Sequence, residues 1–139
     1  MLALPSDPIR RCRAIEAVFG ATVAEVSERR ADRFIAHIQP YEFEALLFSD
    51  VACFAAARAD WSGFVDELQR VREGADSPEH INDGPDTHPS ARLKSLQPSY
   101  DKVLHGSSVA KCIGVDRIRG ECAHFDAWLQ LIEGLPPLR

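Results

Sequence analysis

Two glutamates stand where a predicted strand gives way to a predicted helix. The stretch FIAHIQPYEFEALLFSD, residues 34–50, passes Pro40 and then carries Glu42 and Glu44. Carboxylates near a helix N-terminus stabilise its unpaired N–H groups and the positive end of its dipole. Carboxylate oxygens are also the ligands that Mg²⁺ prefers. Within one helix the two side chains would point about 200° apart. Two interpretations therefore stay open: helix capping, or a magnesium site with a catalytic carboxylate.

A second group of candidate ligands lies in the predicted loop 74–88. Its segment HINDGPDTHP offers His80, Asp83, Asp86 and His88. Mixed histidine and aspartate sets can bind transition metals. Asn and Asp beside Gly and Pro are equally typical of turns, in which they bond nearby backbone amides. Asp83 is thus a candidate metal ligand alongside Glu42 and Glu44, with ordinary turn chemistry as the alternative.

A basic segment rich in hydroxyl groups follows the loop. Six basic and two acidic residues lie between Arg92 and Arg119, although the whole chain has a formal net charge of −5. Arginine offers phosphate oxygens a planar fork, lysine offers a point charge, and a serine at a helix start can join backbone N–H groups. Solvated helix faces produce the same pattern. The candidate nucleic-acid or phosphate contacts are Ser90, Arg92, Lys94, Tyr100, Lys102 and His105.

The chain as a whole has an ordinary globular composition. Its 139 residues are 45% hydrophobic and 27% charged, which suits residues 1–139 as a single domain or as the C-terminal part of a larger α/β domain. The chain shows neither a membrane-spanning run nor a signal peptide, so we expect a cytoplasmic protein without membrane contact. The four cysteines lack metal-site spacing and are expected to be buried free thiols.

The periodicity of apolar residues predicts about six helices and one clear strand near residues 33–39. The first helix has Asp7 as its N-cap, Pro8 in its first turn and Gly20 as its expected end. Apolar residues from Trp61 to Val71 recur at helical spacing. A lone strand leaves two edges of unpaired backbone groups. We therefore expect it to pair with a second copy, with an unrecognised strand in the chain, or with upstream sequence.

Three motifs in order resemble a bacterial family of unknown function, DUF 4276. They are QPYEFEALLFSD, SPEHINDGPDTHPSARLKSLQPSYDKVLHG and GVDRIRGECAHFDAWLQLIE, and the resemblance runs from about Leu4 to Glu133. Glu42 and Glu44 match the glutamates of the family's EFEALLF motif. Tyr41 stands where the family usually has a histidine. The resemblance assigns no roles to the other positions that match the family pattern, which are Asn82, Asp83, Pro89, Ser90, Arg92, Tyr100, Lys102, His105 and Gly106.

The resemblance implies a Toprim-like α/β fold for the intact family. This chain would be its mostly α-helical C-terminal part, without an upstream portion that carries further acidic residues. The implied function is Mg²⁺-dependent, nuclease-like handling of phosphodiesters, together with an ATPase, in defence against foreign DNA. Because two-metal phosphodiester chemistry needs several convergent carboxylates, this chain alone is expected to lack the full acidic site.

Two other functions fit the same residues. One is a non-catalytic interaction module that docks on a partner ATPase or forms a homodimer through its strand edge. The other is a phosphate-binding domain without chemistry, which predicts salt-sensitive binding of nucleic acid through residues such as Arg92 and Lys102.

Overall fold

The computed structural model describes residues 5–27, 31–82, 84 and 87–137, and its regular elements there are all helical. The α-helices are α1 (Pro8–Val26), α2 (Phe43–Leu47), α3 (Ala52–Ala57), α4 (Val65–Glu73), α5 (Pro89–Leu96), α6 (Ser107–Ile113), α7 (Val115–Glu121) and α8 (Ala123–Glu133). Short 3₁₀ turns form η1 (Ala31–Arg33), η2 (Ala59–Phe64) and η3 (Pro78–His80). A π-helical turn, η4, spans Lys102–Gly106.

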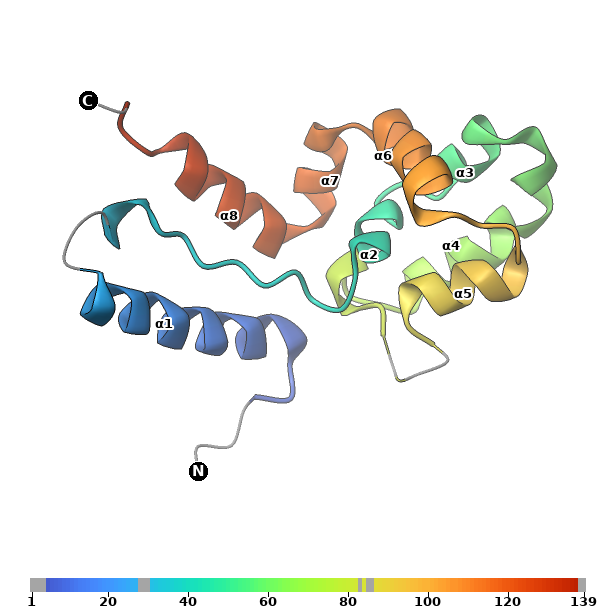
Figure 1. The fold of residues 1–139 in the computed structure, drawn as a ribbon. Coiled ribbons are helices and arrows are strands. Elements are labelled where there is room, and N and C mark those ends of the chain that lie inside the picture. Colours follow the sequence, from blue (N-terminus) through green and yellow to red (C-terminus); the bar gives the residue numbers. More distant parts are fainter. Residues whose placement is uncertain (1–4, 28–30, 83, 85–86, 138–139) are drawn as a thin grey trace.

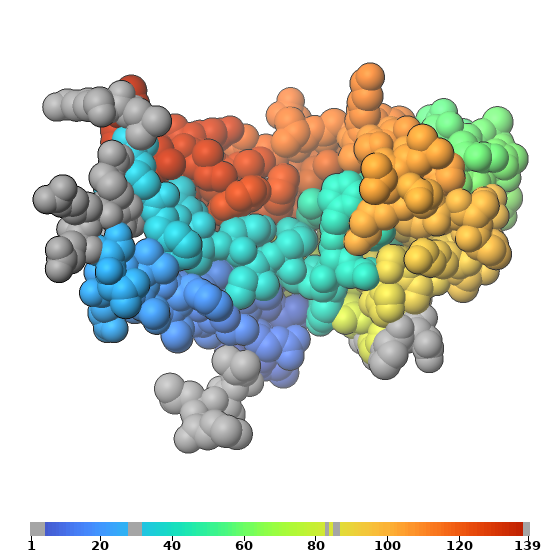
Figure 2. Space-filling view, in the orientation of Figure 1, coloured from blue at the N-terminus to red at the C-terminus, as the bar shows by residue number. Residues whose placement is uncertain are grey.

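The helices form two regions that share one extended connection. In one region α1 and α8 lie on either side of an extended segment, residues 34–39, which separates them along most of its length (Figure 1). Helices α2 to α7 gather beyond the end of this segment (Figure 1). The space-filling view shows the extended segment closely packed between the neighbouring helices (Figure 2).

The hydrophobic core belongs mainly to the second region. Its largest fully buried apolar side chains include Trp61, Phe48, Phe54 and Leu68. In contrast, Cys12 is the one buried residue of α1. Helix α1 is therefore attached at the side of the core, and polar contacts with the extended segment and α8 contribute to holding it.

The expected α/β, Toprim-like fold with a strand at residues 33–39 is wrong for the residues that the structure describes. None of them lies in a strand; residues 34–39 are extended, and Arg33 ends η1. Side chains, instead of a neighbouring strand, bond this backbone: Ile38 N–H donates to Glu16 Oε1 at 2.7 Å, and Ile38 C=O lies 3.2 Å from His124 Nε2. The expected homodimer through a strand edge loses its structural basis for the same reason.

Two further expectations also need correction. Residues from Trp61 to Val71 do not form one α-helix, because η2 precedes α4. The cysteines are not all free thiols: Cys53 and Cys112 form a disulfide that joins α3 to α6, with a Cα–Cα distance of 5.7 Å.

In the part of the chain that is described, no helix combines the length and the apolar character needed to cross a membrane.

Candidate functional site

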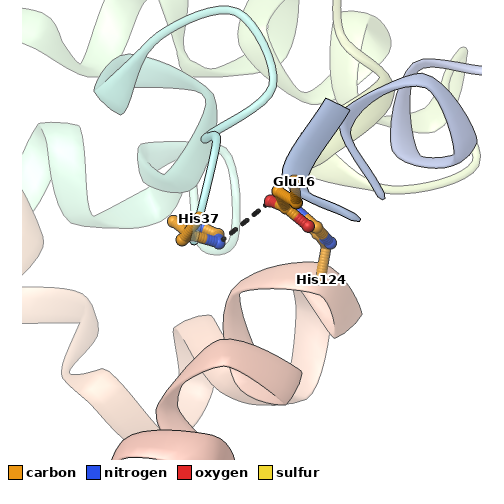
Figure 3. Close-up of side chains that lie close together, drawn as sticks. All are labelled: Glu16, His37 and His124. Atoms are coloured by element: carbon orange, nitrogen blue, oxygen red, sulfur yellow. Dashed lines mark hydrogen bonds and ion pairs between the residues drawn. The ribbon is translucent and has the colours of Figure 1, made fainter. Parts of the chain in front are cut away.

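Three potential metal ligands meet where α1, the extended segment and α8 converge. They are Glu16 from α1, His37 from the extended segment and His124 from α8, which Figure 3 shows close together. Among the described residues, one ligand atom from each lies within 4.8 Å of the others. We call these residues the Glu–His–His triad.

Glu16 is the centre of this group. Its Oε1 lies 2.9 Å from His124 Nε2 and 3.7 Å from His37 Nδ1, and it also accepts the hydrogen bond from Ile38 N–H. Its side chain is only 14% exposed. Glu16 is placed there because α1 turns this side toward the extended segment. Asp7 fixes the start of α1 by accepting a 2.7 Å hydrogen bond from Arg10 N–H.

His124 is held by the N-terminus of α8. The Glu79 carboxylate accepts hydrogen bonds from the backbone N–H groups of His124 and Phe125, at 2.9 and 3.0 Å. Glu79 is 1% exposed, whereas Cys122, at the N-cap position, provides no side-chain cap. Glu79 therefore caps α8 from 45 residues upstream and fixes the residue that carries the imidazole.

His37 is held by aromatic stacking. Its ring lies 4.9 Å from the His124 ring and 4.5 Å from the Trp128 ring, with interplanar angles of 27° and 15°. Burial, and then the neighbouring His124, lower the pKa of His37 below its usual value. His37 is consequently neutral at pH 7, and neutral imidazole is the form that binds metals.

The spacing of the triad is close to that of a tetrahedral metal site. With metal–ligand bonds of about 2.1 Å, ligand atoms of a tetrahedron lie about 3.4 Å apart. The two distances from Glu16 Oε1, 2.9 Å to His124 and 3.7 Å to His37, lie on either side of this value. The third distance, between the ligand nitrogens of the two histidines, is within 4.8 Å. Without an ion, Glu16 Oε1 is hydrogen-bonded to His124 Nε2 and to Ile38 N–H, whereas His37 Nδ1, at 3.7 Å, lies beyond hydrogen-bonding distance.

A pocket of about 200 Å³ opens beside the triad. Besides the triad itself, it is lined by Arg13, Ala36, Ala127, Trp128 and Leu131. Arg13 is exposed and forms neither a hydrogen bond nor an ion pair with any described residue. The pocket thus combines potential metal ligands, a free guanidinium group and apolar walls.

The two glutamates singled out by sequence lie elsewhere and are each engaged. Glu42 accepts hydrogen bonds from the Ser90 N–H and hydroxyl groups at 2.8 and 2.9 Å, and its Oε2 lies 3.1 Å from His88 Nδ1. It follows Tyr41, whose φ of 63° is unusual for a residue with a side chain. Burial raises the pKa of Glu42, but the bonds from Ser90 and His88 outweigh burial, and the net pKa is lowered.

Glu44 is fully buried, and its Oε2 lies 2.9 Å from Lys102 Nζ. Neither carboxylate oxygen has a hydrogen-bond donor in aligned geometry, so the attraction is mainly one of charge. The Tyr100 hydroxyl is likewise buried without a hydrogen-bond partner. Burial, and then the charge of Glu44, raise the pKa of Tyr100.

Each glutamate that was predicted to bind metal therefore contacts a residue that was predicted to bind phosphate: Glu42 contacts Ser90, and Glu44 contacts Lys102. Of the other phosphate candidates, Arg92 donates to Thr87 C=O, Lys94 is exposed on α5, and His105 Nδ1 accepts from Asp101 N–H at 2.9 Å. Asp83 lies outside the described residues. The roles assigned to these residues, magnesium binding included, stay predictions.

Sequence reasoning missed the triad because its members are 21 and 87 positions apart and form no local motif. One signal was present. Glu16 interrupts the apolar stripe of the first helix, between Cys12, Ile15 and Phe19. A charged side chain on a buried face needs a partner, but the sequence did not show which residue supplies it.

The comparison with known families shows which family this chain belongs to. The family described as "Domain of unknown function (DUF4276)" matches residues 3–133. The chain belongs to this family. No curated protein and no solved structure matches the chain. Membership in DUF4276 thus confirms the resemblance found in the sequence, and arguments about function depend on the geometry of the site.

Proposed function

We propose that this DUF4276 chain binds one divalent transition-metal ion through Glu16, His37 and His124. The observation that carries the proposal is the convergence of three ligand atoms within 4.8 Å, from three separate parts of the chain. Their side chains are 14%, 12% and 4% exposed, so the ligands are held in a largely dry environment. Imidazole and carboxylate groups that converge in this way are donor types that bind divalent transition metals.

The donor set favours zinc or iron over magnesium. Imidazole nitrogen suits Zn²⁺ and Fe²⁺, whereas Mg²⁺ prefers oxygen ligands in near-octahedral geometry. Two histidines with one glutamate are a ligand set of catalytic zinc sites, and two histidines with one carboxylate also bind non-haem iron. Both kinds of site leave coordination positions open for water or substrate. The pocket beside the triad provides the space for such a group.

The reaction that we propose for this site is metal-assisted hydrolysis of a phosphate ester. A divalent ion held by Glu16, His37 and His124 would polarise a phosphoryl oxygen and lower the pKa of bound water. Arg13, at the same pocket, provides positive charge for a phosphate group. This keeps the reaction class implied by the family resemblance but moves it from Glu42 and Glu44 to the triad. A partner ATPase, nucleic acid as substrate and a role in defence remain predictions.

The competing function is a non-catalytic interaction module. The observation that favours it is apolar surface around a second pocket of about 270 Å³, whose lining includes Phe19 and Phe34. These side chains are 55% and 42% exposed. Under this hypothesis the triad is only a polar contact between α1, the extended segment and α8, and added metal does not stabilise the fold.

Metal titration separates the two functions. Zn²⁺, Fe²⁺ (under anaerobic conditions), Mn²⁺ and Mg²⁺ are added to metal-free protein, and thermal unfolding is measured together with calorimetric binding. We expect zinc or iron to stabilise the protein by about 2.7 kcal/mol when the free ion is about a hundred times Kd. Magnesium should have a much smaller effect.

The control variants locate the site. H37A and H124A should each abolish the stabilisation by metal. H88N removes an imidazole outside the triad and keeps a good N-cap for α5, so its response should equal that of the unmodified protein. If no ion stabilises the protein, or if H37A responds as strongly as H88N, the proposed function is wrong.

A further inference from the structure

The pocket beside the Glu–His–His triad has the features of a binding site for one class of ligand. It is small, about 200 Å³, compared with roughly 300–1,000 Å³ for pockets that hold drug-sized ligands. Its ligand must therefore be a small molecule or one end of a larger one. Besides the triad, a charged wall and an apolar wall line the pocket, and each constrains the chemistry of the occupant.

The charged wall selects an anion. Arg13 supplies the guanidinium group of the pocket lining, and no described residue forms an ion pair with this positive charge. The one acid of the lining, Glu16, is already engaged by Ile38 N–H and by His124. A planar guanidinium binds the two oxygens of a phosphate or carboxylate group in parallel, which fixes the orientation of the anion.

The apolar wall selects a ligand with a hydrophobic part. Trp128, Leu131, Ala127 and Ala36 line the pocket. The Trp128 ring is held in place because it stacks on His37 at 4.5 Å. A rigid aromatic surface next to a free arginine suits a small molecule with an apolar body and an anionic end.

We infer that this pocket binds a small organic oxyanion, with its charged group between Arg13 and the triad and its apolar body against Trp128 and Leu131. The inference rests on the proposed function, because an ion held by the triad would supply the second positive charge. It goes beyond that function by naming the class of ligand. Phosphate monoesters with a short apolar group fit this description.

The test uses phenyl phosphate, with inorganic phosphate and phenol as the two halves of the probe. Each is titrated into the full chain by calorimetry, with and without zinc. Phenyl phosphate should bind the zinc-loaded protein at least about ten-fold more tightly than either half, because charge and apolar contacts each contribute. Equal affinity for phosphate and phenyl phosphate would overturn the apolar part of the inference.

Arg13→Gln tests the charged part. It should weaken phenyl phosphate about ten-fold or more, since it removes a charge-assisted contact, and should leave the Kd for zinc within about two-fold. Lys111→Gln is the matched control, because it removes one positive charge from α6, outside the pocket. An R13Q variant that binds phenyl phosphate as tightly as K111Q would refute the role of Arg13.

The metal-free titration keeps the two proposals distinguishable. If zinc does not bind but phenyl phosphate binds in an Arg13-dependent way, the proposed function fails and the ligand class stands. If zinc binds and phenyl phosphate does not, the ligand class fails and the metal site stands. If neither binds, both are wrong.

Discussion

Replacing Glu79 by glutamine should destabilise the protein strongly, although the change removes no atom from the hydrophobic core. The Glu79 carboxylate bonds the N–H groups of His124 and Phe125, the second and third residues of α8. Glutamine keeps one acceptor and turns its amide NH₂ group toward the other donor. An unsatisfied buried donor costs about 1–3 kcal/mol, and loss of the negative charge at the helix start costs up to about 2 kcal/mol. We expect a total of about 3 kcal/mol.

This figure converts into a measurable change in melting temperature. At about 2.1 cal/mol/K per residue, the unfolding entropy of 139 residues is about 0.29 kcal/mol/K, so 1 kcal/mol shifts Tm by about 3.4 °C. E79Q should therefore melt about 10 °C lower by circular dichroism. Hydrogen exchange at the start of α8 should accelerate as well, because its first amides lose their acceptor.

The matched control is Glu73→Gln. Glu73 is exposed on α4, and its described partner is the Gln69 amide at 2.8 Å. A surface change of this kind alters the unfolding free energy by less than about 0.5 kcal/mol. If E79Q melts within about 2 °C of E73Q, the remote capping of α8 is refuted.

Three further outcomes are expected. Lys102→Met should cost about 2 kcal/mol by urea denaturation, because it leaves the buried Glu44 charge uncompensated; the loss should largely disappear when Glu44→Gln is added. Folding lowers the pKa of Glu42, so the ionised carboxylate stabilises the folded protein at pH values above its pKa in the unfolded chain. This stabilisation is lost as the pH falls through the lower pKa of the folded protein. The difference in unfolding free energy between wild type and Glu42→Gln should therefore shrink below about pH 4.5. Reducing the Cys53–Cys112 disulfide, which spans 59 positions, should lower stability by about 4 kcal/mol in a thermal melt with and without reductant. A constant difference for Glu42 across acidic pH, or equal melting of oxidised and reduced protein, would contradict these expectations.

Local signals located the start of the first helix but not its end. Asp7 caps α1 as predicted, and Gly134 directly follows the last residue of α8. Helix α1 nevertheless continues through Gly20 to Val26. A glycine costs only about 1 kcal/mol inside a helix, so contacts along the rest of the helix can outweigh it. The cap at Asp7 is local and readable from the sequence, whereas the remote cap of α8 and the balance that decides where a helix stops are not.

The extended segment shows why the fold class was not readable from the sequence. Phe34, Ile35 and Ile38 are typical of a strand, and the segment is indeed extended. The pattern could not show which groups form hydrogen bonds with the backbone of this segment. Glu16 and His124 satisfy Ile38 from two helices, at sequence separations of 22 and 86. The candidate site was missed for the same reason, because these side chains converge only in the folded chain.

The capping of α8 by Glu79 also has a consequence for the order in which the chain folds during its synthesis on the ribosome. An isolated helix of 11 residues is marginal in water, and this one lacks a cap of its own. Its acceptor, however, is synthesised 45 residues earlier. When α8 leaves the exit tunnel, the carboxylate that it needs is already outside. A circular permutant that starts at Ala123 would reverse this order, and the new N-terminal helix would have to wait, unformed, for its acceptor to be translated.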